Sequence, residues 1–183
     1  MTLTIVLAAA AVLVIIDQII KYFVVQNLAP SGSVSVIDNF LSLTYAENTG
    51  VAFGMFKDRI WIFAIVTIVL IAVFVWLIAS KKIEGKLFYF SAALMIGGGV
   101  GNLIDRLFRG FVVDYLSLSF FSPVCNFADY CITIGAFLFV IVLLFQTSKE
   151  KKKTKEGEET TDNNEASTDE ENVSDDSGEK DGD

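Results

Sequence analysis

Four long apolar stretches dominate the chain, and each is long enough to cross a bilayer as a helix. They cover residues 3–25, 60–80, 87–104 and 130–148. The last three carry no charge, and about 20 apolar residues span the hydrocarbon core of a membrane. Because lipid offers the backbone no hydrogen bonds, helices are the expected conformation. The pattern predicts an all-α membrane protein with four transmembrane helices, the first of which is too long for a signal peptide.

A different pattern separates the first two apolar stretches. A turn signal at residues 30–33 is followed by alternation, with Leu41, Leu43 and Tyr45 on one face and polar or small residues between them. A period of two with one apolar face is typical of a strand. We expect a small β-sheet that lies on the membrane surface.

Charge divides the chain at residue 148. The sequence has 22 acidic and 14 basic residues; eight of each precede residue 149, so the last 35 residues carry 14 acids against 6 bases and the whole net charge of −8. This segment also lacks aromatic residues and cannot bury a core. Residues 1–148 are therefore predicted to form the membrane domain, and residues 149–183 a disordered acidic tail.

The basic residues indicate the orientation. Two lysine clusters flank the helices: Lys81, Lys82 and Lys86 after the second, and four lysines within 149–153 after the fourth. Short basic loops face the cytoplasm, so both termini are expected inside and residues 26–59 and 105–129 outside. Arg106 and Arg109 then break the rule on the outer side, and residues that break a topology rule are candidates for function.

The kinds of titratable residue in the chain limit the catalytic mechanisms that are possible. The chain has no histidine, and its two cysteines, Cys125 and Cys131, lie six residues apart with no partner ligands nearby. This excludes Ser-His and Cys-His catalysis and every His-ligated metal. Any catalysis must rest on carboxylates, amides, lysine or arginine.

Two groups of residues stand out within or next to the apolar stretches, one in the first stretch and one at the end of the third. Asp17 and Lys21 are four apart on one helix face, a spacing that suits a mutual ion pair, a substrate contact, or both. Gly97 and Gly101 form a G-x-x-x-G pair that allows close helix packing. Asn102, Asp105 and Arg106 continue the same helix and cluster on it.

Asp114 and Asp129 can be interpreted in two ways, as structural residues or as a catalytic pair. Asp114 is isolated in apolar sequence, whereas Asn126 and Asp129 have the spacing of a capping box at the start of the fourth helix. Capping and a catalytic pair of Asp114 with Asp129 both remain open from spacing alone. The simplest interpretation of Asn48 and Gly50 is a turn that ends the strand.

Five motifs together resemble the signal peptidase II family, the bacterial membrane aspartic peptidases that process lipoproteins. They are DQIIK at 17–21, NTGVAF at 48–53, GNLIDR at 101–106, VVDY at 112–115 and NFAD at 126–129. Their order and spacing fit the family over residues 1–148. Cys125 and Tyr115 depart from it, since aromatic residues and Phe, respectively, are usual there.

The resemblance implies roles for individual residues. Asp114 and Asp129 would be the catalytic dyad, without metal or other cofactor. Substrate contacts would fall on seven residues: Asp17, Lys21, Asn48, Gly50, Asn102, Arg106 and Asn126. Two close carboxyls share one proton. Because a helix N-terminus favours the anion of Asp129, we expect Asp114 to carry that proton more often.

The resemblance also implies a substrate and a place. The enzyme would cut a diacylglyceryl-modified prolipoprotein just before its lipidated cysteine, near the outer face of the bacterial cytoplasmic membrane. It would act as a monomer among membrane lipids, without nucleic acid, and globomycin would block it.

Two other classes fit parts of the sequence. A small transporter or channel would use Asp17, Lys21 and Arg106 as a polar path, which predicts charges spread through the bilayer. A membrane scaffold packed by Gly97 and Gly101 predicts that both aspartates tolerate asparagine. Neither class explains five ordered motifs.

Overall fold

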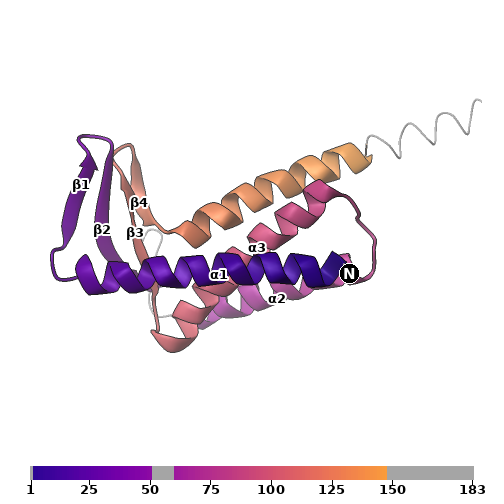
Figure 1. Ribbon diagram of the computed structural model, residues 1–183, viewed down its shortest axis with the longest axis horizontal. Helices are drawn as coiled ribbons and strands as arrows, with labels where there is room; N and C mark the ends of the chain where they lie inside the picture. Colours follow the sequence, from indigo (N-terminus) through magenta and orange to yellow (C-terminus); the bar gives the residue numbers. More distant parts are fainter. Residues whose placement is uncertain (1, 51–59, 148–183) are drawn as a thin grey trace, which may run out of the picture. The chain divides into compact units, whose positions relative to one another are not determined.

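A computed structural model describes residues 2–50 and 60–147 of the chain (Figure 1). The elements follow in the order α1 (Thr2–Asn27), β1 (Ser33–Ile37), β2 (Leu41–Asn48), α2 (Ile60–Ala79), α3 (Lys86–Phe108), β3 (Val112–Leu118), β4 (Phe121–Cys125) and a fourth helix, Phe127–Thr147. The predicted fold class, four spanning helices with a small sheet, is confirmed. The predicted acidic tail lies outside the described residues.

The described residues up to Val140 belong to one compact unit, and the last described residues, 141–147, are the end of the fourth helix. All four helices are long and apolar enough to cross a membrane. The 20 residues of α2 span about 30 Å, the thickness of the hydrocarbon core. Its side chains are apolar all round, and Trp61 and Ile65 remain more than 60 % exposed. Such a helix requires lipid around it.

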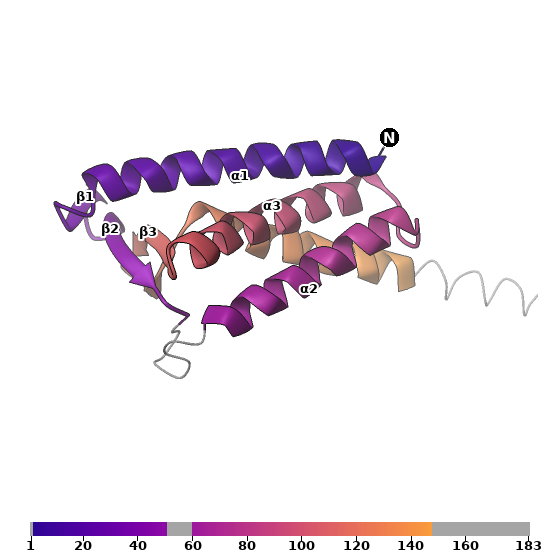
Figure 2. The same cartoon turned by 90° about the horizontal axis from the view of Figure 1, so that it is seen from below.

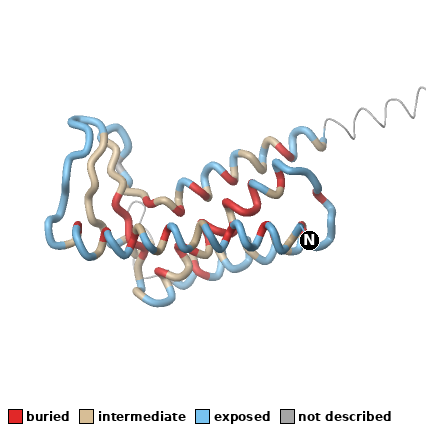
Figure 3. Tube along the Cα trace, in the orientation of Figure 1, coloured by how far each residue is buried: buried red, intermediate tan, exposed pale blue. Residues whose placement is uncertain are grey.

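Helix α3 is the most buried of the helices and lies between α1 and α2 (Figure 2; Figure 3 marks its buried positions in red). A Cβ added at Gly97 would approach Leu13 of α1 to 2.9 Å, and one added at Gly101 would approach Asp17 Oδ2 to 2.6 Å. The predicted role of these glycines in close helix packing is confirmed. On the other side of α3, the Ser91 hydroxyl donates to the carbonyl of Gly135 at 2.8 Å.

The sheet is antiparallel, with strand order β1-β2-β3-β4. It lies at the end of α1 farthest from the N-terminus (Figures 1 and 2). The predicted alternation appears as β2, which pairs with both β1 and β3. A small core joins the sheet to the helix, where Val24 of α1 and Leu28 just after it pack with Val113 and Tyr115 of β3. This core anchors β3, which carries Asp114, to α1.

Helix α3 runs past the predicted boundary at residue 104 and ends at Phe108. Asp105 and Arg106 therefore lie on its last turn, where a basic residue is compatible with the helix dipole. Gly110 follows with φ of +78°, a conformation that glycine adopts without strain. This turn leads the chain from α3 directly into β3.

Candidate active site

Asp114 lies on β3 and is only 2 % exposed. Two asparagines donate to its carboxyl group from different elements. Asn48, at the end of β2, reaches Oδ2 at 2.8 Å, and Asn126, just before the fourth helix, reaches Oδ1 at 2.6 Å. Pairing of β2 with β3 sets Asn48 in place, because Ala46 lies opposite Asp114 in the register. Both oxygens of this acid are thus held by neutral amides.

Asp129 lies in the first turn of the fourth helix and forms the predicted capping box with Asn126. The Asn126 backbone N–H donates to Asp129 Oδ2 at 3.1 Å, and the Asp129 N–H donates to Asn126 Oδ1 at 2.9 Å. The side-chain amide of Asn102, on α3, donates to Asp129 Oδ1 at 2.8 Å. Asn126 therefore bonds both carboxyl groups, that of Asp129 through its backbone N–H and that of Asp114 through its side-chain amide, so the capping box lies directly beside Asp114.

Lys21 lies behind these acids and is completely buried. Its ammonium group is 2.9 Å from Asp17 Oδ2 and 2.9 Å from Asp105 Oδ2, and it donates to Asn102 Oδ1 at 2.8 Å. The predicted ion pair with Asp17 is therefore present. The same ammonium also orients Asn102. Because the amide oxygen of Asn102 faces Lys21, its NH₂ group faces Asp129.

Asp105 is a residue that the sequence analysis placed in a polar cluster but did not include in the site. Its Oδ2 accepts the backbone N–H of Val113 at 3.2 Å, next to Asp114 on β3. Its Oδ1 accepts from Gln18 at 3.4 Å and pairs with Arg109. With Asp17, Lys21, Asp105 and the half-exposed Arg109, the network holds two acids and two bases. Their formal charges cancel, which limits the cost of burying three of them.

The signal that marks Asp105 is its spacing. It lies three residues after Asn102, so both side chains point from α3 toward α1. A charge at that position in a spanning helix needs a partner, and Lys21 supplies it. The sequence pattern gives the helix face but not the partner.

Gly50 and Arg106 lie at the edge of the described residues, beside the ring of Phe63. The Gly50 N–H donates to Asn48 Oδ1 at 2.9 Å, and Gly50 has φ of +101°. A Cβ at this position would come within 2.8 Å of the Phe63 ring. The Arg106 guanidinium carbon lies 5.9 Å from the same ring's centroid. Among the described residues, the buried Nε of Arg106 has no hydrogen-bond partner.

Burial dominates the electrostatics of Asp114 and raises the pKa of its carboxyl group to about 6. The hydrogen bond from Asn48 lowers the pKa, the charge of Asp129 raises it, and the Asn126 hydrogen bond and the Lys21 charge lower it again. An acid with a pKa near 6 holds its proton more readily than an ordinary aspartate. This direction agrees with the expectation that Asp114 carries the shared proton.

Tyr115 adds a contact that a phenylalanine lacks. Its hydroxyl accepts the backbone N–H of Phe127 at 3.2 Å and so ties β3 to the start of the fourth helix. Burial raises the pKa of this hydroxyl, which keeps it neutral. Asp114 and Asp129 lie on the two elements that this bond joins.

Eight of the nine residues chosen from the sequence form one connected network of hydrogen bonds and an ion pair. Asp114, Asp129, Asn48 and Asn126 are joined directly by hydrogen bonds, with Gly50 bonded to Asn48. Asn102 links them to Lys21 and Asp17. Arg106 lies apart, beside Phe63. Within residues 2–50 and 60–147, no group of three or more His, Cys, Asp or Glu side chains is placed to hold a metal ion.

The fold and this site define a multi-pass membrane protein with a buried polar site at one end of its helices. The chain belongs to the signal peptidase II family, whose model, described as "Signal peptidase (SPase) II", matches residues 9–145. It is therefore a membrane peptidase. The family predicted from the five motifs is confirmed.

Individual relatives agree with this assignment. The lipoprotein signal peptidase of Caldanaerobacter subterraneus subsp. tengcongensis is 39 % identical over 136 residues, covering 74 % of this chain and 93 % of the relative. That of Shouchella clausii is 35 % identical over 145 residues, covering 79 % and 96 %. Two solved structures of a bacterial membrane enzyme, both by the in meso method, superpose with TM-scores of 0.71 and 0.69 at 31 % identity. They cover 80 % and 77 % of this chain, and 91 % and 93 % of the solved chains.

Proposed function

We propose that this membrane peptidase is an aspartic endopeptidase that removes the signal peptide from diacylglyceryl-modified prolipoproteins, cutting just before the lipidated cysteine. The observation that carries the proposal is the position of Asn126, which contacts the carboxyl groups of Asp114 and Asp129 at once. Two acids joined through one residue, which donates its backbone N–H to Asp129 and its side-chain amide to Asp114, are suited to act on one water molecule.

The two acids differ in their burial. Each accepts N–H donors at both oxygens, but Asp114 is 2 % exposed whereas Asp129 is half-buried at the start of a helix. We therefore assign the proton to Asp114 and the anion to Asp129. The anion takes a proton from water as the water oxygen attacks the scissile carbonyl. Asp114, protonated, donates to the carbonyl oxygen. Collapse of the tetrahedral intermediate then returns that proton to Asp114, while the proton held by Asp129 passes to the leaving amine.

The buried network has a positioning role in this proposal. Lys21 holds the oxygen of Asn102, so the Asn102 amide can present only N–H to Asp129. Lys21 also holds Asp105, which fixes the Val113 backbone beside Asp114. The substrate-contact roles predicted for Asp17, Lys21 and Asn102 stay predictions, and in this structure those three side chains are buried among protein groups.

The surroundings of the site suit a lipidated substrate. Lys81 and Lys82 lie in the loop between α2 and α3, at the ends of these helices opposite to the site. With that loop in the cytoplasm, the acids lie near the outer face of the bacterial cytoplasmic membrane and both termini lie inside. The acyl chains of a substrate can then stay in the bilayer while the peptide reaches the acids. The enzyme is proposed to act as a monomer.

Cleavage by the purified full chain tests the proposal. A diacylated prolipoprotein is expected to be cut at the bond before the lipidated cysteine, as read by mass spectrometry of both products. The same precursor without the diacylglyceryl group is the control and is expected to remain intact. Globomycin is expected to stop the reaction. Cleavage at another bond, or equal cleavage of the unlipidated precursor, contradicts the proposed function.

The pH dependence of kcat/KM follows from the pKa of Asp114. The carboxyl group must hold its proton to act as the acid, and that proton is lost as the pH rises through about 6. We expect kcat/KM, which reports the free enzyme, to fall above this value. The charged groups acting near Asp114 are Asp129, Lys21 and Arg106.

An Asn48→Ala variant tests whether this pH dependence comes from Asp114. The Asn48 hydrogen bond lowers the pKa of Asp114, so its removal raises the pKa and moves the falling limb to higher pH. The position of the limb is the readout, because the rate itself also depends on substrate contacts. If kcat/KM falls at the same pH in Asn48→Ala and in wild type, the loss of activity at high pH does not come from deprotonation of Asp114.

A further inference from the structure

The ring of Phe63 lies where α2 meets the region of the two acids, and it touches two segments that are far apart in the sequence. The guanidinium carbon of Arg106, on the last turn of α3, lies over the ring at 5.9 Å from its centroid. Gly50, just after β2, lies against the ring, because a Cβ built there would come within 2.8 Å of Cε2 and 3.0 Å of Cδ2. One side chain of α2 therefore contacts the ends of β2 and α3 at once.

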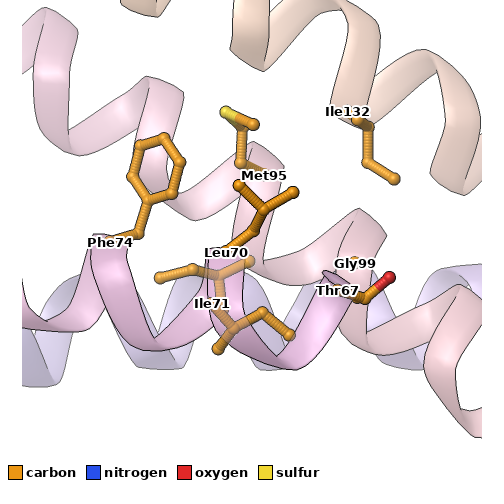
Figure 4. Close-up of a pocket in the computed structure, with 8 residues that line it drawn as sticks. Thr67, Leu70, Ile71, Phe74, Met95, Gly99 and Ile132 are labelled. Carbon is orange, nitrogen blue, oxygen red and sulfur yellow. The ribbon is translucent and has the colours of Figure 1, made fainter. Parts of the chain in front are cut away.

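The packing of α2 against α3 places this ring. Thr67 of α2 lies beside Gly99 of α3 (Figure 4), where a Cβ added to the glycine would be 3.4 Å from Thr67 Cγ2. Phe63 lies about one turn closer to the site than Thr67, whose hydroxyl donates to the Phe63 carbonyl at 2.8 Å. Arg106 lies about two turns closer than Gly99, and its side chain leans back along α3, because side chains in a helix lean toward the N-terminus. The ring and the guanidinium group therefore meet.

The ring can support the guanidinium group without using its hydrogen-bond donors. A cation over an aromatic face, within about 6 Å of the centroid, is attracted by the quadrupole of the ring. Arginine carries five N–H donors in a planar fork; a carboxylate partner would use two of them, whereas attraction to a ring face needs none. Among the described residues, the buried Nε of Arg106 has no hydrogen-bond partner. Arg106 is thus held with donors available to a carbonyl oxygen.

The held guanidinium group lies next to the acids. Arg106 is one turn beyond Asn102 on the same face of α3, and the amide of Asn102 donates to Asp129 at 2.8 Å. The carboxylates whose charges act most strongly on Arg106 are those of Asp129 and Asp114. A peptide placed over the two acids would therefore lie within reach of this arginine.

The contact with Gly50 gives the ring a second effect, on Asn48. The Gly50 N–H donates to Asn48 Oδ1 at 2.9 Å. With its oxygen engaged in this way, Asn48 presents its NH₂ group to Asp114 Oδ2 at 2.8 Å. The ring supports this turn from behind, at a point where any side chain in place of the glycine would collide with it.

We propose that Phe63 is a positioning residue of this peptidase, whose ring directs the Arg106 guanidinium group toward a carbonyl oxygen of the substrate and supports the Gly50 turn that aims Asn48 at Asp114. This inference rests on the proposed function and on the substrate contact predicted for Arg106. It gives α2 a part in the site, although none of the five sequence motifs lies on that helix. A displacement of about 1 Å can cost a rate factor of about 100, so weaker support is expected to lower the rate.

Fluorination of the ring tests its attraction for the cation with little change of shape. The full chain is made with a trifluorinated phenylalanine at position 63, because fluorine withdraws negative charge from the ring face. We expect kcat/KM for the diacylated precursor to fall about three- to tenfold, with unchanged denaturant unfolding in detergent. Phe137→Leu is the matched control for Phe63→Leu, since it makes the same change at a phenylalanine that is 66 % exposed on the fourth helix. Phe63→Leu is expected to lose about tenfold or more and Phe137→Leu nothing. Wild-type kcat/KM in the fluorinated protein overturns the proposed support of Arg106.

Arg106→Gln removes the cation and shows whether the ring acts through it. Fluorination at position 63 is expected to cause no further loss in this variant. An equal loss in both backgrounds contradicts a role through Arg106. Single-turnover cleavage with the enzyme in excess allows these slow proteins to be compared.

The pH profile reports the contact with Gly50. Phe63→Leu removes the support of the turn and so weakens the Asn48 hydrogen bond, which lowers the pKa of Asp114. The pH at which kcat/KM falls is therefore expected to rise, as in Asn48→Ala, whereas fluorination keeps the ring and leaves this pH unchanged. A fall at the wild-type pH in Phe63→Leu overturns this part of the proposal. Failure of the wild-type protein to cut the diacylated precursor would instead contradict the proposed function.

Discussion

Asp114→Asn and Asp129→Asn are each expected to lower the rate of prolipoprotein cleavage by about 10²–10⁴-fold, the contribution typical of a positioned acid or base. Asparagine preserves the size of the side chain and much of its hydrogen bonding, but it neither takes nor gives the proton that the reaction transfers. The measurement is cleavage of the diacylated precursor by purified variants. Both proteins should still insert and fold, because the substitutions leave the spanning helices intact.

Asp38→Asn is the matched control for this loss. Asp38 is an exposed aspartate near the β1–β2 turn, where its carboxyl group accepts from Ser35 at 2.8 Å. The same chemical change there is expected to leave cleavage within about twofold of wild type, since surface changes rarely exceed 0.5 kcal/mol. Near-normal cleavage by Asp114→Asn or Asp129→Asn would count against the dyad and in favour of a scaffold.

Lys21→Met is expected to lower the free energy of unfolding by about 3–5 kcal/mol, the cost of removing one partner from a buried ion pair. Methionine fills most of the volume of lysine, so the loss reports charge and hydrogen bonds and not a cavity. Asp17 and Asp105 would be left as two buried anions facing one another, with Arg109 as the remaining base. Denaturant unfolding in detergent measures the effect.

Two further variants distinguish the contribution of Lys21 to stability from its role in positioning Asn102. Lys82→Met, at an exposed lysine over the Trp76 ring, is the control and should change stability little. The double variant Lys21→Met, Asp17→Asn restores neutrality and should recover much of the lost stability. If Lys21 positions Asn102, this double variant remains poorly active; full activity would show that Lys21 matters to folding alone. A Lys21→Met protein as stable as wild type would contradict the buried network itself.

Local spacing explains which features could be read from the sequence. The spanning helices follow from the length of the apolar stretches, and the capping box of Asn126 and Asp129 is a contact between residues three apart. The Asp17–Lys21 pair is likewise local. Such features depend on one helix alone, so the sequence pattern was sufficient for them.

Contacts between distant segments were not predictable in the same way. Strand β3 is buried on both faces around Asp114, so it shows no alternation that would identify it as a strand. Its pairing with β2 joins residues 66 apart, as in the Asn48–Asp114 hydrogen bond. Lys21 and Asp105 are 84 residues apart and meet only because Gly97 and Gly101 bring α1 and α3 together. The role of Asp105 therefore emerges only from the fold.

We propose that Asp114 and Asp129 act as one catalytic unit on one water molecule, and a double-mutant cycle tests this most directly. Groups that act as a unit are strongly non-additive, so removing both costs about as much as removing one. The cleavage rates of Asp114→Asn, Asp129→Asn and the double variant should therefore be similar. A double variant whose loss relative to wild type equals the product of the two single losses would show two independent contributions and contradict the proposed dyad.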